Sequence, residues 1–156
     1  MKLRPVYLLF FCSAVLLFLS RPPLGYCLTL ITPEEAAKPD APLVTKRGFV
    51  ISQQEVQGPK INIFTPKADE KIRNPFIIEI RFEKLPDKVI DFQTLKLKYI
   101  KFIPIDLTNR VLPFLLENRL TVKDVDVPQG KHKLRLSIAY ATGEQSEMEI
   151  VLNVEK

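Results

Sequence analysis

The sequence predicts an all-β domain, folded as an antiparallel sandwich of about seven strands. The first observation is a hairpin pattern over residues 128–154, where two runs of alternating apolar and polar residues flank a Thr-Gly-Glu-Gln turn. A period of two is typical of strands with one buried face. The second is that similar runs recur about every 10 to 20 residues between turns rich in proline and glycine. The third is that no run alternates with a long helical pattern, which disfavours a parallel α/β sheet.

Residues 1–27 are predicted to be a signal peptide. Lys2 and Arg4 form a short basic start, and residues 6–19 carry no charge. This run is shorter than the roughly 20 residues that span a bilayer, and it matches the apolar region of a secretory signal. We therefore expect an exported protein, periplasmic or secreted.

The end of the signal peptide has alternative interpretations. Cleavage after Cys27 is expected, with a site after Ser20 as the alternative. Leu24 to Cys27 also resembles a bacterial lipobox, in which the cysteine would be lipidated, but Tyr26 is large for that pattern. An uncleaved membrane anchor is the remaining alternative, so contact with a membrane is expected only through this N-terminal segment.

Residues 28–58 are predicted to be an exposed linker. The segment contains scattered prolines and shows no sustained periodicity. Thr32 and Pro33 are suited to begin one helical turn over residues 34–38. Residues 48–51 could add an edge strand.

The domain proper is expected over residues 59–156. Its alternating runs predict strands at 60–65, 76–83, 95–101, 120–127, 133–140 and 146–154. An irregular stretch separates the third run from the fourth, and within it residues 105–112 could form a short helix or a 3₁₀ turn capped by Asp106.

Net charge and cysteine content limit which partners and which disulfides are expected. The chain carries a formal net charge of +5, and three of its basic residues lie in the predicted signal peptide, which has no acid. The remaining chain therefore carries only about +2, and no nucleic-acid partner is expected. Cys12 and Cys27 also lie in that segment. No internal disulfide is expected, so the core alone must stabilise the domain.

Three segments carry a resemblance to a known family. They are the opening strand Pro59–Pro66, the turn Pro128–His132 before a long strand, and the last hairpin turn Tyr140–Glu144. Together they make residues 59–155, about 97 of the 156 residues, similar to the bacterial immunoglobulin-like (Big-type) domains of exported proteins. The resemblance implies an immunoglobulin-like β-sandwich and a role in adhesion, spacing or ligand display, without catalytic residues. The family often has Asp and Asn where Tyr140 and Glu144 stand, so bound calcium is not inferred.

No catalytic motif is present in the sequence. It lacks Gly-x-Ser-x-Gly and a glycine-rich phosphate loop. The single histidine, His132, is predicted to be an exposed turn residue. Zinc would need several His or Cys ligands, and Asp124 and Asp126 are too few for an EF-hand, so no metal or cofactor is expected. Paired carboxylates could in principle hydrolyse glycosides, which leaves a small envelope hydrolase as a distant alternative.

One basic cluster is the main candidate for binding. If the third and fifth of the expected strands are neighbours, four basic side chains share a solvent face: Lys96, Lys98, Lys133 and Arg135. Lys133 and Arg135 could pair with Glu147 and Glu149 on the last strand, at about 0.2–1 kcal/mol per pair. Alternatively, they form a patch for an anionic envelope polymer or lipid headgroup, with Ile100 and Lys101 at its rim. The chain has no Trp, so a platform for stacking sugars is poorly supported.

The densest polar group outside a strand surrounds Asp106 and Arg110. Their spacing of four residues would allow an ion pair within a short helix. Such a pair is a structural clamp, although irregular loops on a rigid sandwich also carry binding sites.

These observations favour a non-enzymatic exported module that binds or spaces components of the cell envelope. The expected partner is an envelope protein or an anionic polymer. A carbohydrate- or anionic-polymer-binding module that uses the basic sheet face is the alternative.

Overall fold

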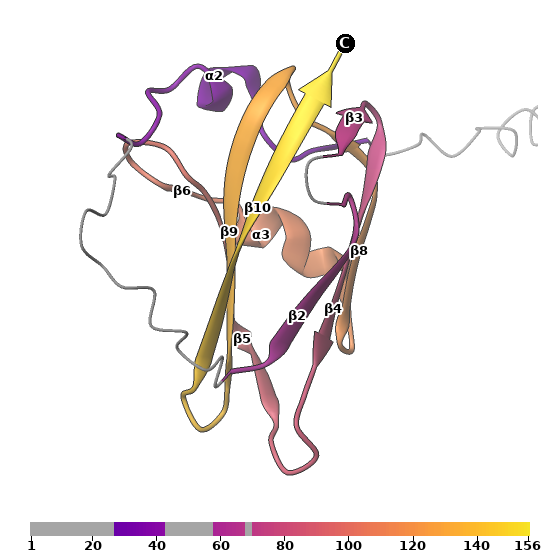
Figure 1. The fold of residues 1–156 in the computed structure, drawn as a ribbon, viewed down its shortest axis with the longest axis vertical. Coiled ribbons are helices and arrows are strands. Elements are labelled where there is room, and N and C mark those ends of the chain that lie inside the picture. The colour runs from indigo at the N-terminus through magenta and orange to yellow at the C-terminus, as the bar shows by residue number, and fades with distance from the viewer. Residues whose placement is uncertain (1–26, 43–57, 68–69) are drawn as a thin grey trace, which may run out of the picture.

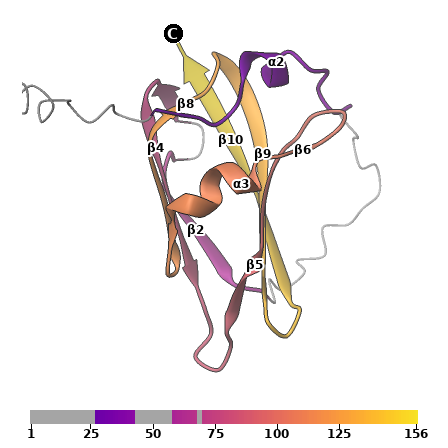
Figure 2. The same cartoon turned by 180° about the vertical axis from the view of Figure 1, so that it is seen from behind.

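Two β-sheets of five strands each pack face to face in the computed structural model, which describes residues 27–42, 58–67 and 70–156 (Figures 1 and 2). Sheet A has the order β1 (Leu28–Thr29), β8 (Arg119–Asp126), β4 (Phe76–Glu83) and β2 (Lys60–Thr65), with β7 (Leu115–Leu116) paired to β8. Sheet B has the order β3 (Lys71–Arg73), β10 (Gln145–Glu155), β9 (Gly130–Tyr140), β5 (Ile90–Tyr99) and β6 (Ile105–Asp106). The predicted β-rich class is confirmed.

The C-terminal hairpin of β9 and β10 follows its sequence pattern. Its strands pair antiparallel, with Leu136 opposite Met148 and Leu134 opposite Ile150. The inward residues Leu134, Leu136 and Ile138 of β9 are almost completely buried. The turn closes because Gly143 adopts a φ of 98°, which glycine tolerates, and its N–H donates to the carbonyl of Tyr140. This hairpin is confirmed.

The sheets are mixed, so the expectation of a purely antiparallel sandwich is wrong. β1 runs parallel to β8, and β3 runs parallel to β10. Both strands are only two or three residues long. A run this short cannot display a period of two, so the sequence carries no signal for them, and β3 falls between the strands predicted at 60–65 and 76–83.

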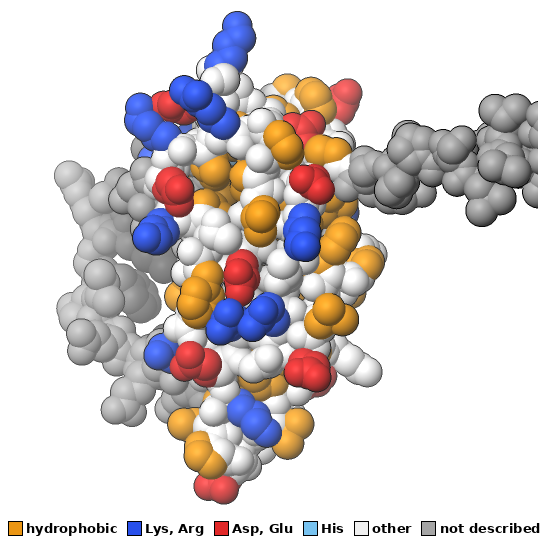
Figure 3. Space-filling view, turned by 90° about the vertical axis from the view of Figure 1, so that its right-hand side faces the viewer, with side chains coloured by type: hydrophobic (Ala, Val, Ile, Leu, Met, Phe, Trp, Pro, Cys, Tyr) orange, Lys and Arg blue, Asp and Glu red, His pale blue; other side chains and the backbone are white. Residues whose placement is uncertain are grey.

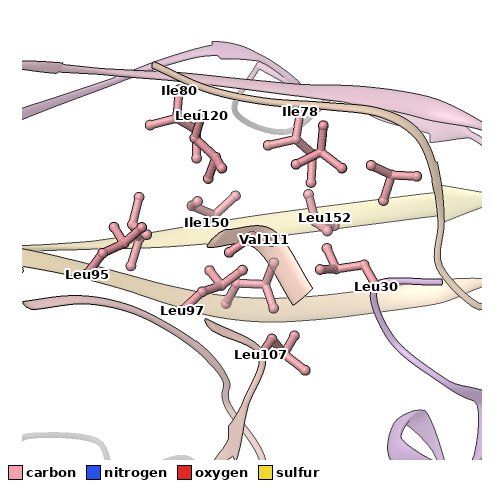
Figure 4. Close-up of a cluster of buried hydrophobic side chains, with 14 of the residues drawn as sticks. Leu30, Ile78, Ile80, Leu95, Leu97, Leu107, Val111, Leu120, Ile150 and Leu152 are labelled. Carbon is pink, nitrogen blue, oxygen red and sulfur yellow. The ribbon is translucent and has the colours of Figure 1, made fainter. Parts of the chain in front are cut away.

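The core lies between the sheets and is closed on one side by the connection from β6 to β7. This connection contains α3 (Thr108–Val111) and the 3₁₀ turn η1 (Leu112–Phe114). Leu107 and Val111 are buried among side chains of both sheets (Figure 4). The Asp106 carboxylate accepts the Thr108 N–H at 2.8 Å, just ahead of the helix. The expected short helix is therefore present, and it begins three residues later than the predicted range.

The predicted exposed linker is wrong for residues 28–42. These residues, together with Cys27, form a segment that we call the N-terminal strap. The strap crosses one end of the sandwich, from β8 to the β5–β6 hairpin (Figures 1 and 2). Leu30 and Ile31 are fully buried in the core, and the Leu30 N–H donates to the Asp126 carbonyl at 3.0 Å. The strap is thus an integral part of the domain.

The strap contains the helical turn expected at its centre. α2 (Pro33–Ala36) begins after Thr32, whose hydroxyl accepts the Glu35 N–H at 3.2 Å, while the Glu35 carboxylate accepts the Thr32 N–H at 2.9 Å. This reciprocal capping box stabilises the turn. The predicted signal peptide up to residue 26 and the candidate edge strand at 48–51 lie outside the described residues. No helix in the described ranges is long and apolar enough to span a membrane.

Candidate functional site

The four basic residues of the predicted patch lie on the outer face of sheet B. Lys98 is opposite Arg135 and Lys96 is opposite Ser137 in the β5–β9 pairing. Lys133 is exposed two residues before Arg135. The alternate residues of both strands point into the core, so these side chains point to solvent. We call Lys96, Lys98, Lys133 and Arg135 the basic face.

Acidic side chains border the basic face on both sides. One row across the sheet reads Asp106, Lys98, Arg135 and Glu149 from β6 to β10. The Arg135 guanidinium contacts the Glu149 carboxylate at 2.8 Å, and this hydrogen bond raises the pKa of Arg135. Hydrogen bonds from Thr108, and then the charges of Lys98 and Lys96, lower the pKa of Asp106. The ion pair of Arg135 therefore neutralises part of this surface, whereas Lys96, Lys98 and Lys133 form no ion pair within the described chain.

Arg110 does not pair with Asp106, so that prediction is wrong. The helix begins at Thr108, which leaves Asp106 outside it in β6. Arg110 instead reaches the N-terminal strap, where its Nη2 and Nη1 atoms lie 2.7 and 2.8 Å from the two carboxylate oxygens of Glu35. Nη1 also donates to the Leu30 carbonyl at 2.7 Å. The hydrogen bond from Arg110 lowers the pKa of Glu35 despite partial burial. Arg110 is a structural clamp on the strap.

Lys101 is buried beneath the strap instead of lying at the rim of the basic face. Its Nζ donates to the Ala36 carbonyl at 2.9 Å and to the Asp40 carboxylate at 2.6 Å, and it lies 5.1 Å from the Tyr99 ring centroid. Burial lowers the pKa of Lys101, but hydrogen bonds to Asp40 and Tyr99 outweigh this effect and raise it. The signal was in the sequence, because Lys101 continues the inward series of Leu95, Leu97 and Tyr99.

His132 is also buried, so its assignment as an exposed turn residue is wrong. It lies in β9, in the same inward series as Leu134 and Leu136. The ring joins the Tyr99 hydroxyl at 2.8 Å through Nδ1 and the Pro128 carbonyl at 2.8 Å through Nε2. A carbonyl can only accept, so Nε2 carries the proton and Nδ1 accepts from Tyr99 in the neutral ring. Burial lowers the pKa of His132.

This neutral histidine predicts acid sensitivity. The unfolded chain takes up a proton below the ordinary pKa of 6.5, whereas folded His132 resists it. The free energy of unfolding should therefore decrease as the pH falls from about 6.5 towards 5, by at most about 1.4 kcal/mol per pH unit. Urea unfolding across this range measures the slope. No other histidine contributes, because the chain has one.

The variant His132→Gln provides the control for this slope. Glutamine can donate and accept but does not titrate, so the decrease above about pH 5.5 should be absent from this variant. Carboxylates with a lowered pKa, such as Glu144, contribute at about pH 5 and below in both proteins. A variant that retains the wild-type slope would exclude His132 as its source.

The opposite end of the sandwich is held by the turn at which the chain departs from the family pattern. The Tyr140 hydroxyl accepts the Leu85 N–H at 3.1 Å. The Glu144 carboxylate contacts Lys88 and Thr142, and the hydrogen bonds from Lys88 and then Thr142 lower the pKa of Glu144 to about 2. These residues join the β4–β5 and β9–β10 loops, so both Tyr140 and Glu144 have structural roles.

A groove runs along the side of the sandwich where β2 faces β10. Two hollows of about 630 and 530 Å³ form it, both lined by Ile61 and Met148. Glu83 and Glu149 lie at the larger hollow, but both are exposed, and they pair with Lys60 at 3.4 Å and Arg135 at 2.8 Å. A general acid needs the opposite, a buried carboxyl without a cation beside it. Among residues 27–42, 58–67 and 70–156, no three His, Cys, Asp or Glu side chains are placed to hold a metal ion.

One outer side of the molecule carries acidic, basic and hydrophobic side chains together. Figure 3 shows acidic and basic side chains interspersed there, with separate hydrophobic side chains between them. Phe64 is one exposed hydrophobic residue of sheet A, and the Arg81 guanidinium covers its ring at 4.4 Å. No single-sign charge dominates the side drawn in Figure 3.

Comparisons with known proteins found no matching family model, no matching curated protein and no matching solved structure.

Proposed function

We propose that this protein is an exported, non-enzymatic immunoglobulin-like module that binds or spaces components of the cell envelope. Export follows from the signal-peptide pattern of residues 1–27. Binding, and not catalysis, fits a sandwich whose titratable residues hold strands, loops and the strap in place.

The strand order supports the immunoglobulin-like assignment. β2, β4 and β8 are neighbours in sheet A, and β10, β9 and β5 are neighbours in sheet B. In chain order this matches strands A, B and E in one sheet and G, F and C in the other. One difference concerns the place beside the E strand, which strand D fills in that family. Here two short strands share it, because β7 pairs with the start of β8 and β1 of the N-terminal strap pairs with its end.

The observation that carries a binding role is the basic face. Its four side chains are mounted on β5 and β9, which lie inside sheet B with neighbours on both sides. Rigid strands hold the charges at fixed spacing, which favours recognition of a repeating anionic ligand. This supports an anionic envelope polymer as the partner, because Lys96 and Lys133 are exposed to contact it.

Charge reversal of the basic face should weaken binding to such a polymer. We expect the variant with Glu at Lys96, Lys98, Lys133 and Arg135 to bind long-chain polyphosphate, used as the probe, about tenfold or more weakly than the wild type. Titration at low salt measures the affinity, which should fall as salt is raised.

A matched variant separates the basic face from net charge. It carries Glu at four exposed positions on the sheet A side: Lys60, Lys84, Arg119 and Lys123. The change in net charge is the same, but this variant should bind like the wild type. Equal loss in both variants would mean that only total charge matters, and unchanged binding in the basic-face variant would contradict the proposal.

A further inference from the structure

The tip of the β5–β6 hairpin has the reverse of the usual distribution of side chains. Phe102 and Ile103 are 67% and 72% exposed, and Pro104 beside them is exposed too. The charged neighbour Lys101 is only 5% exposed. Exposing two adjacent large apolar side chains while burying an ammonium group is unfavourable for an isolated domain. Such departures from local rules concentrate at functional sites.

The backbone of the tip is fixed. The Phe102 N–H donates to the Pro39 carbonyl at 2.9 Å, and the Ile100 N–H donates to the Lys133 carbonyl at 2.8 Å. Between these bonds, Lys101 reaches inward to Ala36 and Asp40 of the N-terminal strap. The exposure of Phe102 and Ile103 is therefore a property of an anchored loop.

Exposed lysines surround the tip. Lys38 precedes the residue that binds the Phe102 N–H, and Lys133 provides the carbonyl that binds Ile100. Lys131 is exposed two residues before Lys133 on β9. The nearby acid Asp40 is bound to Lys101, whose charge compensates it. The surroundings of the two apolar side chains are thus positively charged.

Three other exposed apolar residues lie in a different setting. Leu85 and Val89 lie in the β4–β5 loop at the opposite end, where Lys88 is paired with Glu144 and the exposed Asp87 offsets the charge of the exposed Lys84. Phe64 lies beneath Arg81. At the hairpin tip, by contrast, the exposed apolar residues 102 and 103 lie near lysines that no acidic side chain of the described chain compensates.

We propose that this tip docks on an anionic lipid bilayer. Phe102 and Ile103 enter the boundary between headgroups and acyl chains, and Lys38, Lys131 and Lys133 contact the lipid phosphates. Two side chains insert only weakly by themselves, so the contact is reversible and orients the domain on a surface. The inference rests on the proposed function only in that an exported envelope module meets a membrane.

A single tryptophan can report the insertion. The chain contains none, so Phe102→Trp in the full chain introduces the only one. With vesicles of phosphatidylcholine and phosphatidylglycerol, we expect the emission of this indole to shift to the blue and to be quenched by brominated lipids. Local depth is the required readout, because the apolar residues 6–19 could attach the full chain to vesicles by themselves.

Val89→Trp is the matched control, because Val89 is also 67% exposed but lies at the other end. Its emission should not change. Equal quenching at both positions, or none at position 102, would overturn the proposal. Ile103→Trp provides a second reporter, which should behave like Phe102→Trp, and thermal unfolding verifies that each variant is folded.

The lysines are tested in the Phe102→Trp background. Replacing Lys38, Lys131 and Lys133 by Gln should weaken insertion of the indole at position 102 into the anionic vesicles, read from its quenching, about a hundredfold, at about fivefold per lysine. The same change at Lys60, Lys84 and Lys123 should have little effect. Quenching of the indole at position 102 that is as strong in pure phosphatidylcholine would contradict the anionic-lipid assignment. Binding of polyphosphate to the basic face is a separate measurement, so either proposal can fail without the other.

Discussion

Replacing Leu30 with alanine is expected to lower the free energy of unfolding by about 2–5 kcal/mol. Leu30 is fully buried and lies in the core cluster with Leu107 and Val111 (Figure 4). The substitution removes apolar contacts and leaves a cavity between the strap and α3, because both elements are held by hydrogen bonds and cannot collapse freely. Urea unfolding followed by circular dichroism measures the change.

An exposed leucine provides the reference. Leu116 lies in β7 with its side chain largely in solvent, so Leu116→Ala should change stability by no more than about 0.5 kcal/mol. If Leu30→Ala were as mild, the strap would be an exposed linker after all. The contrast therefore tests whether the domain begins at Cys27 or near residue 59.

Replacing Arg110 with alanine is the second substitution with a large expected effect, about 2–3 kcal/mol of unfolding free energy. It leaves the Glu35 carboxylate, which is 14% exposed, without its cation, and the Leu30 carbonyl without its donor. Breaking a fully buried pair costs about 3–5 kcal/mol. The Arg110 side chain is 31% exposed, so water compensates part of the loss.

The effect of Arg110→Ala should depend on pH in a defined direction. Arg110 lowers the pKa of folded Glu35 below its ordinary value of 4.5. The pair therefore stabilises the fold above that pH and loses its contribution as the pH falls through the lowered pKa. Wild type and variant should converge in acid, as measured by thermal unfolding at successive pH values.

Arg135→Ala is the matched control for the ion pair. Arg135 also forms a 2.8 Å contact with a glutamate, but both side chains are about half exposed. An exposed pair contributes about 0–1 kcal/mol. Comparable losses in the two variants would show that the strap contact is no stronger than a surface ion pair.

The long strands could be predicted from sequence because each shows a repeated alternation of apolar and polar residues. β9 and β10 display several alternations in succession, and a register shift of one residue would turn all their apolar side chains to solvent. The same alternation places Lys96 and Lys98 on the solvent side of β5. Which strand lies beside β5 depends on the whole fold. The sequence could therefore predict the basic face only on the condition that β5 and β9 are neighbours.

The strap could not be predicted because its partners are distant in sequence. Leu30 and Ile31 are adjacent, and both are buried, so they show neither a helical period nor a period of two. Glu35 meets Arg110 across 75 residues and Lys101 meets Asp40 across 61. Proline-rich composition suggested a linker, whereas tertiary contacts fixed the segment.

Two buried polar residues were missed for a different reason. Lys101 and His132 continue the inward rows of β5 and β9, so their position was indicated by the period. Their residue types instead predicted exposed side chains, because lysine is rarely buried without a partner. The partners, Asp40 for Lys101 and Tyr99 for His132, become neighbours only when the strap and the two strands come together.

The strap also determines how the domain responds to tension. If the N-terminal segment stays uncleaved as an anchor, a pull on it would be borne first by the two residues of β1 and by the contacts of Arg110, before any load reached the long β9–β10 hairpin. β1 pairs with β8 through only two residues, whereas β9 and β10 pair along their length, so we expect the strap to yield before the sheets separate. Its departure uncovers Leu107 and Val111, which pack in the same core cluster as Leu30. Under such a load, we expect the first change in the domain to be the exposure of apolar core surface.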